Sequence, residues 1–174
     1  MQRKAISLAL LFSLISATTA NAVITEWKLP IKKYTPGAIN PDVNQNNISS
    51  TICKVGWTAT IRPSSSYTNK IKIDQLKTTY KSFAKIWGES LSAYEEDHLI
   101  SLQLGGSPTN PKNLFPQPYK GNNAYKKDIL ETKLKKMVCS GTIKLADAQK
   151  AIASNWVKAF NLYASKENTT ELIN

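Results

Sequence analysis

The sequence predicts a single α+β domain, in which a short β-hairpin and the helix after it are braced by further helices and one disulfide. Two short β-type segments, 92–100 and 113–117, flank a stretch rich in Gly and Pro. Apolar residues recur at helical spacing in the segments on either side of this hairpin. The two cysteines, Cys53 and Cys139, lie far apart in the sequence and can tie its ends together.

The first 22 residues have the features of an export signal. Arg3 and Lys4 precede an apolar run that is too short to span a bilayer, and Ala20–Ala22 forms an A-x-A cleavage site. A first core helix or an N-terminal anchor is the alternative. Cleavage would leave 174 − 22 = 152 residues, 23–174, which is enough for one domain with its own core. We therefore expect an exported protein, periplasmic or secreted, with no membrane span in the mature chain.

Export determines how the cysteines are interpreted. An even number of cysteines in an oxidising compartment predicts one disulfide, between Cys53 and Cys139. Two free buried thiols are the alternative. A zinc site is disfavoured, because the sequence has no C-x-x-C and only one histidine.

The charge of the chain is strongly positive. The whole sequence carries +11, and loss of Arg3 and Lys4 leaves 23 − 2 = 21 basic against 12 acidic residues, or +9. Such a protein is attracted to nucleic acid, anionic envelope polymers or membrane headgroups. Arg62 is the one arginine left after processing, and base recognition depends heavily on arginine, so the charge favours binding to phosphate regardless of sequence. A solvated, lysine-rich surface is the alternative.

The first half of the mature chain is predicted as follows. Segment 23–50, rich in Pro and Asn, is expected to be loop-rich, and β-branched residues in 50–61 predict a strand or extended segment before Arg62-Pro63. A helix is predicted over 74–87, with Asp74 as its N-cap and Gly88 as its end. The apolar stripe of that helix is Leu76, Tyr80, Phe83 and Trp87.

The second half contains the hairpin and two long helices. The first predicted strand, 92–100, leads through a long turn over 102–112 to the second strand, 113–117. A helix follows, capped by Asn122 or Asn123 and ending near Ser140-Gly141. The last helix is expected over 145–164, and its buried stripe is Leu145, Ala148, Ile152, Trp156, Phe160 and Tyr163.

The hairpin and the helix after it carry residues that resemble the HNH (ββα-metal) endonuclease motif. The matching stretches are D-H-L-I-x-L-x-L-G-G from Asp97, N-L-F-P from Asn113 and N-N-A-x-K-K-D from Asn122. The spacings are 113 − 98 = 15 and 123 − 113 = 10. The flanking sequences resemble small exported bacterial and phage proteins with this motif. The resemblance implies an HNH-like nuclease domain over 23–174, with its ββα-metal core at about 92–138.

The resemblance also assigns a metal site. Asp97 would be one ligand, and the amide oxygen of Asn123, or of Asn122, would be the other. Oxygen donors of this kind suit a hard divalent cation, so one Mg²⁺ is expected, with Mn²⁺ as the alternative.

The catalytic residues implied by the resemblance are His98 and Asn113. His98, the single histidine of the chain, would be the general base, because a neutral imidazole accepts a proton from water near pH 7. Asn113 would orient the loop that carries His98. Taken singly, a paired surface histidine, turn chemistry at Asn113 and helix capping at Asn122 or Asn123 are the alternatives.

These assignments predict an exported, metal-dependent endonuclease that hydrolyses DNA, or RNA, with little sequence preference. Arg62 is a candidate for contact with the phosphate or for pairing with a buried carboxylate. Lys120, Lys126 and Lys127 are candidates for phosphate contacts or are simply solvated. Glu95 and Glu96 are expected to serve local structure or to support the metal ligands without contacting the metal. The alternatives are a non-catalytic cationic protein that binds nucleic acid or envelope polymers, and a secreted effector that acts through a protein partner. An inhibitor or immunity protein is a further partner that the sequence does not specify.

Overall fold

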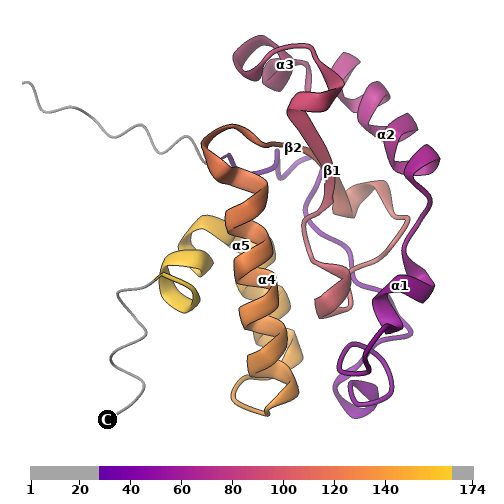
Figure 1. Cartoon of the computed structure of the whole chain (residues 1–174), viewed down its shortest axis with the longest axis vertical. Coiled ribbons are helices and arrows are strands. Elements are labelled where there is room, and N and C mark those ends of the chain that lie inside the picture. The colour runs from indigo at the N-terminus through magenta and orange to yellow at the C-terminus, as the bar shows by residue number, and fades with distance from the viewer. Residues whose placement is uncertain (1–27, 166–174) are drawn as a thin grey trace, which may run out of the picture.

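The computed structural model describes residues 28–165 (Figure 1). The predicted signal peptide, 1–22, lies outside these residues. Within them, no helix has both the length and the apolar character needed to cross a membrane. The regular elements are, in chain order, α1 (Trp57–Ile61), α2 (Ser65–Lys77), α3 (Lys81–Trp87), β1 (Tyr94–His98), β2 (Leu114–Pro118), α4 (Asn123–Cys139) and α5 (Leu145–Tyr163), with short 3₁₀ turns at 45–47, 91–93, 102–104, 111–113 and 120–122.

The two strands form an antiparallel hairpin, as the sequence predicts. Asp97 lies opposite Phe115 and His98 opposite Leu114, and the Leu99 amide donates to the main-chain oxygen of Asn113 at 2.7 Å. The first strand is shorter than the predicted 92–100, because the chain turns away immediately after His98, and the second has the predicted length but lies one residue later. The mixed α and β composition is thereby confirmed, with a helix directly after the hairpin.

A two-stranded sheet is marginal on its own, and here helices contact it from two sides. Neighbouring residues on a strand face opposite ways. Accordingly Asp97 meets Lys127 of α4 at 2.7 Å, whereas the charge of Lys72 on α2 acts on Glu96. Lys72 also donates to the main-chain oxygen of Tyr94 at 3.0 Å. Figure 1 shows β1 with α2 on one side and α4 and α5 on the other.

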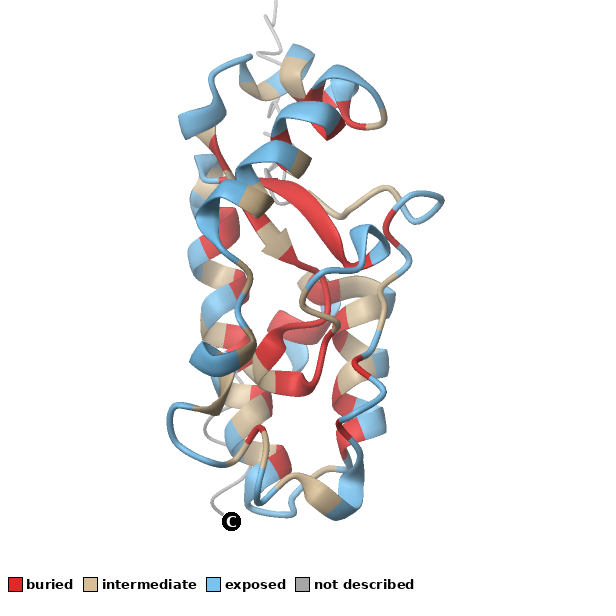
Figure 2. Cartoon of the chain, turned by 90° about the vertical axis from the view of Figure 1, so that its right-hand side faces the viewer, coloured by how far each residue is buried: buried red, intermediate tan, exposed pale blue. Residues whose placement is uncertain are grey.

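The core is largest where α4 and α5 pack against each other and the hairpin. Leu130 and Leu134 of α4 and Ile152 and Trp156 of α5 are fully buried. Figure 2 shows the buried residues gathered on the inward sides of the helices and along the hairpin. The predicted stripe of the last helix is confirmed: Leu145, Ala148, Ile152, Trp156 and Phe160 are buried, and Tyr163 is half-buried.

The strand predicted over 50–61 is wrong. The chain there forms turns and then the short helix α1, held by local bonds such as Thr51 N to Asn47 O and Ala59 N to Gly56 O, each 3.1 Å. Gly56 adopts φ 79°, which suits glycine and redirects the chain into α1. β-branched residues favour strands only where another strand can pair with them, and within residues 28–165 this segment has no such neighbour.

The helix predicted over 74–87 is two helices. Ser64 caps α2 by accepting from the Tyr67 amide at 3.3 Å, so α2 begins well before Asp74. Asp74 therefore lies inside α2 and is not an N-cap. The chain then turns at 78–80, and α3 ends at Gly88 as predicted. The apolar spacing continues through the turn, which explains why the break was not visible in the sequence.

The N-terminal arm, 28–44, has little regular structure, as expected for 23–50, yet it is firmly bound. Thr35 donates to the main-chain oxygen of Leu114 at 3.1 Å, and the Asn40 amide donates to Gly105 O at 2.8 Å. Ile39 forms an isolated bridge with Gly106. The arm thus provides hydrogen-bond partners for the Leu114 oxygen of β2 and for the loop that precedes this strand.

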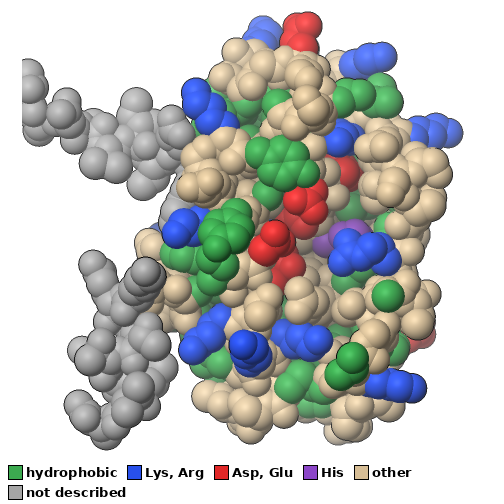
Figure 3. Space-filling view, in the orientation of Figure 1, with side chains coloured by type: hydrophobic (Ala, Val, Ile, Leu, Met, Phe, Trp, Pro, Cys, Tyr) green, Lys and Arg blue, Asp and Glu red, His purple; other side chains and the backbone are tan. Residues whose placement is uncertain are grey.

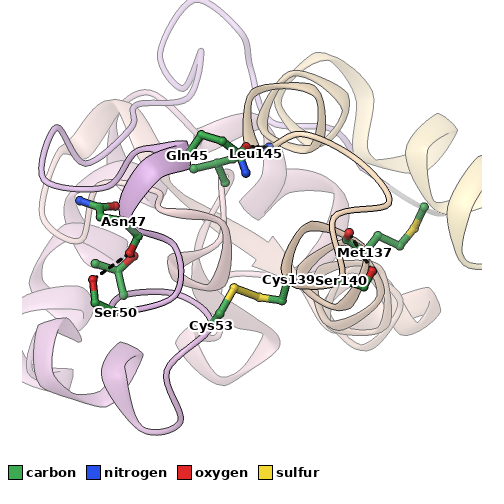
Figure 4. Close-up of a disulfide and its surroundings, with 9 residues drawn as sticks. Gln45, Asn47, Ser50, Cys53, Met137, Cys139, Ser140 and Leu145 are labelled. Carbon is green, nitrogen blue, oxygen red and sulfur yellow. Dashed lines mark hydrogen bonds between the residues drawn. A yellow bond between two sulfur atoms is a disulfide. The ribbon is translucent and has the colours of Figure 1, made fainter.

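The predicted disulfide between Cys53 and Cys139 is present (Figure 4). It closes a loop of 86 residues and joins the turn before α1 to the last residue of α4. Nearby, the Leu145 amide at the start of α5 donates to the Gln45 side chain at 2.8 Å. Both contacts tie the N-terminal third of the domain to the helical pair α4 and α5.

Replacement of both cysteines by serine, Cys53→Ser with Cys139→Ser, is expected to lower the free energy of unfolding by about 2–4 kcal/mol. Urea unfolding of the two proteins under the same oxidising buffer measures the change. Reduction of the unaltered protein is the control and should give the same loss. An unchanged midpoint would show that the bridge adds nothing to stability.

Candidate functional site

His98 ends β1 and is buried, with 5% of its surface exposed. Its Nε2 lies 2.9 Å from the main-chain oxygen of Pro108. A carbonyl oxygen only accepts, so Nε2 must carry the hydrogen, and the neutral ring then has its basic lone pair on Nδ1. Burial lowers the pKa of His98 below its ordinary value. The ring is therefore neutral at pH 7 and can accept a proton.

Asn113 closes the loop between the two strands. Its side chain is fully buried, and Oδ1 accepts from the amides of Ile100 at 2.9 Å and Ala38 at 3.3 Å. Its Nδ2 donates to the main-chain oxygens of Ile100 and Ser107, each at 3.0 Å. Ser107 adjoins Pro108, whose oxygen holds His98. Asn113 is thus placed to fix the orientation of the imidazole without touching it.

The Gly-Gly turn is required by this closure. A Cβ on Gly106 would lie 1.7 Å from the main-chain oxygen of Ile100 and 2.9 Å from Asn113 Nδ2. Gly105 adopts φ 69°, which side-chain-bearing residues rarely take up. Any larger residue at position 106 would separate the Ile100 main chain from the Asn113 amide and break the hydrogen bonds between them.

Asp97 is paired with a buried lysine from α4. Lys127 is fully buried; its Nζ lies 2.7 Å from Asp97 Oδ2, donates to His98 O at 2.7 Å, and donates to Glu131 Oε1 at 2.5 Å. Glu131 in turn accepts from Ser101 Oγ at 2.6 Å. Burial alone would lower the pKa of Lys127, but the two carboxylates raise it above its ordinary value. The ammonium therefore stays charged.

Two further carboxylates lie beside Asp97. Glu95 shares its face of β1, and Asp128 comes from α4. Burial, with the charges of Asp97, Asp128 and Glu131, raises the pKa of Glu95 to about 7, and burial with Asp97 raises that of Asp128. Figure 3 shows acidic side chains gathered beside the histidine, with basic side chains around them. This crowding of negative charge would be relieved by a cation.

Arg62 stands at the edge of this group. It is exposed, and its positive charge lowers the pKa of both His98 and Asp128. Arg62 is therefore a candidate for attracting an anion that binds near His98.

Asn122 and Asn123, the predicted amide ligands, have other surroundings. Asn123 is fully buried; its Oδ1 accepts from the Lys28 amide and its Nδ2 donates to Lys120 O, each at 2.6 Å. It thereby fastens the N-terminal arm to the start of α4. Asn122 is exposed, occupies the N-cap position with φ 58°, and makes no side-chain cap bond. A metal contact by either residue stays a prediction.

The donors at this site fit a cation that needs few protein ligands. Within residues 28–165, no three His, Cys, Asp or Glu side chains are placed to enclose a metal. Asp97 supplies a hard carboxylate oxygen of the kind that Mg²⁺ prefers. Because Mg²⁺ keeps several waters and commonly completes its shell with substrate phosphate, Asp97 could hold it without a protein cage.

The predicted phosphate-binding lysines differ in accessibility. Lys120 Nζ lies 5.9 Å from the Trp87 ring centroid, and Lys126 Nζ lies 5.3 Å from that of Phe160, on α5. Lys127 is enclosed, so a phosphate contact would require the loss of its present bonds. The sequence analysis missed the roles of Ser101, Asp128 and Glu131. The Lys127–Glu131 spacing of four residues on one helix face was the available signal.

Glu96 lies on the opposite face of β1. It is 9% exposed, and neither carboxylate oxygen has a hydrogen-bond partner in the part of the chain that the structure describes. Burial and the charge of Asp97 raise its pKa to about 9. Glu96 is therefore protonated in the folded protein at pH 7.

Gly106→Ala is expected to lower the free energy of unfolding by about 3 kcal/mol or more, because main-chain atoms must move to admit the methyl group. Gly141→Ala is the matched control. Gly141 has φ 78° and nothing within 4 Å of the added Cβ, so a loss of about 1 kcal/mol is expected from backbone strain alone. Thermal and urea unfolding give both values, and equal losses would contradict the close approach at Gly106.

Glu96→Gln is expected to change how stability depends on pH. The folded-state pKa of Glu96, about 9, exceeds its ordinary value of 4.5, so its contribution to stability is full below the ordinary value and is lost as pH rises towards 9. The slope from this group is at most about 1.4 kcal/mol per pH unit. Urea unfolding between pH 5 and 9 should show a flatter profile in Glu96→Gln than in the exposed control Glu89→Gln. Identical profiles would mean that Glu96 ionises normally.

Comparisons with known proteins leave the family of this chain open. No family model, no curated protein and no solved structure matches it. The likeness to the HNH motif accordingly rests on the residues and contacts described above.

Proposed function

We propose that this protein is a metal-dependent phosphodiester hydrolase of the HNH type. The observation that supports this most is His98, neutral and held through Nε2 by Pro108 O, directly beside Asp97 in a strand–strand–helix arrangement. A positioned imidazole next to a carboxylate that can hold a cation is what such hydrolysis needs.

The proposed chemistry uses the Nδ1 atom of His98 as the base. Nδ1 takes a proton from a water molecule, whose oxygen then attacks the phosphorus, and the bond to the leaving sugar oxygen breaks. A divalent cation at Asp97, when bound, would neutralise the phosphoryl oxygens and the departing alkoxide. Asn113 keeps the imidazole in place through the loop that carries Pro108.

DNA is the proposed substrate, with RNA as the alternative, and little sequence preference is expected. The mature chain would carry +9 (21 basic less 12 acidic residues), and Arg62 is an exposed cation whose charge acts on His98. Lysines act on phosphate as point charges, whereas recognition of base edges depends heavily on arginine. The disulfide suits an oxidising compartment, in line with the proposed export to the periplasm or the medium.

A non-catalytic, cationic nucleic-acid-binding protein is the second candidate, and one observation favours it. The Asp97 carboxylate is already paired with Lys127. A site that never loads a cation would bind nucleic acid by charge alone and leave it intact.

His98→Ala is expected to lower the rate of plasmid cleavage about 10²–10⁴-fold, because the general base is lost. In the unaltered protein, kcat/KM should rise with pH through one ionisation below the ordinary histidine value, since burial lowers the pKa of His98. Gel assays with Mg²⁺, with Mn²⁺ and with EDTA measure the rate, and Glu89→Gln is the control for surface changes. A mobility shift without cutting under every condition would support the binding protein instead.

A further inference from the structure

Lys127 has an ammonium that is enclosed by carboxylate and main-chain oxygens. Its side chain is 1% exposed, and Nζ donates to His98 O and Glu131 Oε1 and forms an ion pair with Asp97 Oδ2. Three oxygens therefore surround the ammonium. Two of the three partners are the residues to which the proposed function assigns cation binding and proton transfer.

The ammonium lies where a divalent cation would compete with it. A cation at Asp97 would sit about 2.0–2.1 Å from a carboxylate oxygen if it is Mg²⁺. Lys127 Nζ already lies 2.7 Å from Oδ2 of the same carboxylate. Two positive charges on one carboxylate repel each other, more strongly in a buried site than in water. The Asp97 carboxylate can therefore bind the ammonium or the metal closely, but not both at once.

Resting on the proposed function, we propose that Lys127 is a positioning residue that competes with the divalent cation for Asp97 and keeps cation binding weak until phosphate arrives. With the ammonium in place, Asp97 and the His98 main chain keep their positions while no metal is bound. A phosphodiester brings a negative charge and oxygen ligands, and these increase the affinity of the site for the metal relative to the ammonium. Glu131, supported by Ser101, keeps the ammonium paired after Asp97 turns to the cation.

Lys72 shows what a purely structural buried lysine looks like in the same fold. It is 9% exposed and donates to a β1 main-chain oxygen, that of Tyr94, at 3.0 Å. Among residues 28–165 it forms no ion pair within 4.0 Å. Lys72→Met therefore removes a buried ammonium and one bond to β1 without altering the environment of Asp97. It is the matched control for Lys127→Met.

The test measures Mn²⁺ binding to the full protein by titration calorimetry or by the Mn²⁺ electron paramagnetic resonance signal, with no substrate present. Lys127→Met should bind Mn²⁺ about 10- to 100-fold more tightly than the unaltered protein, the range over which neighbours of a metal ligand commonly change affinity. Lys127→Arg and Lys72→Met should bind as weakly as the unaltered protein. A folded Lys127→Met with unchanged or weaker binding overturns the proposal.

Lys127→Gln covers the case in which the methionine variant does not fold, because its amide can still donate to His98 O and Glu131. If neither neutral variant folds, Mn²⁺ binding to the unaltered protein tests the proposal. Stoichiometric Mn²⁺ binding at micromolar concentration with Lys127 in place overturns the proposal. Weak binding that Asp97→Asn abolishes supports it.

Plasmid cleavage gives a separate readout. In Lys127→Met the Mg²⁺ concentration for half-maximal cleavage should fall while kcat also falls, because the His98 main chain loses a bond. General damage to the site would instead raise that concentration. If no variant cleaves anything but Mn²⁺ binding tightens, the competition is real and the proposed hydrolase activity is wrong.

Discussion

The buried amide of Asn113 is the constraint on which this hairpin depends. A two-residue hairpin turn would fix the register of β1 and β2 by itself, but here the strands are separated by a long excursion. Asn113 replaces that turn with four hydrogen bonds to main-chain atoms, including both polar groups of Ile100. Because the amide is fully buried, each bond that fails would leave a polar group without water. The positions of His98 and Pro108 follow from this closure.

The two faces of β1 manage charge in different ways. Towards α4, the ammonium of Lys127 lies against the carboxylates of Asp97 and Glu131, whose negative charge raises the pKa of Lys127. Towards α2, neither carboxyl oxygen of Glu96 has a hydrogen-bond partner among the described residues, and burial raises the pKa of this group so that it stays protonated. One five-residue strand thus carries an ionic network on one side and a neutral acid on the other. The ionic side carries the acidic group Glu95, Asp97 and Asp128, which includes the carboxylate proposed to hold the cation.

Much of the fold could be predicted from sequence, because it depends on local patterns. The hairpin, the helix after it, the last helix and the disulfide were found from β-type segments, helical spacing and cysteine number. The segment 50–61 was misassigned because β-branched composition says nothing about whether a partner strand exists. The break between α2 and α3 was missed because the apolar spacing runs through it.

The candidate site was predictable only in part, for a related reason. Asp97, His98 and Asn113 lie close in sequence and were recognised by their spacing. The partners that decide their chemistry come from elsewhere: Lys127 and Glu131 from α4, and Ala38 from the N-terminal arm. Burial of a lysine cannot be read from its neighbours in the chain, since lysine is ordinarily exposed. The sequence therefore identified the groups to which a function is proposed, and not the ammonium of Lys127 that contacts two of them.

The contacts of the N-terminal arm affect the order in which the domain folds during synthesis. The amide of Lys28 is held by Asn123, 95 residues later, and its oxygen by Trp156, 128 residues later. A chain that is synthesised from its amino end must release α5 before the arm can dock. Contacts between such distant residues form late and slowly. Docking of the arm is consequently completed only after α5 has been made, and a nascent fragment that already contains Asp97 and His98 still lacks the bond from Trp156 to Lys28.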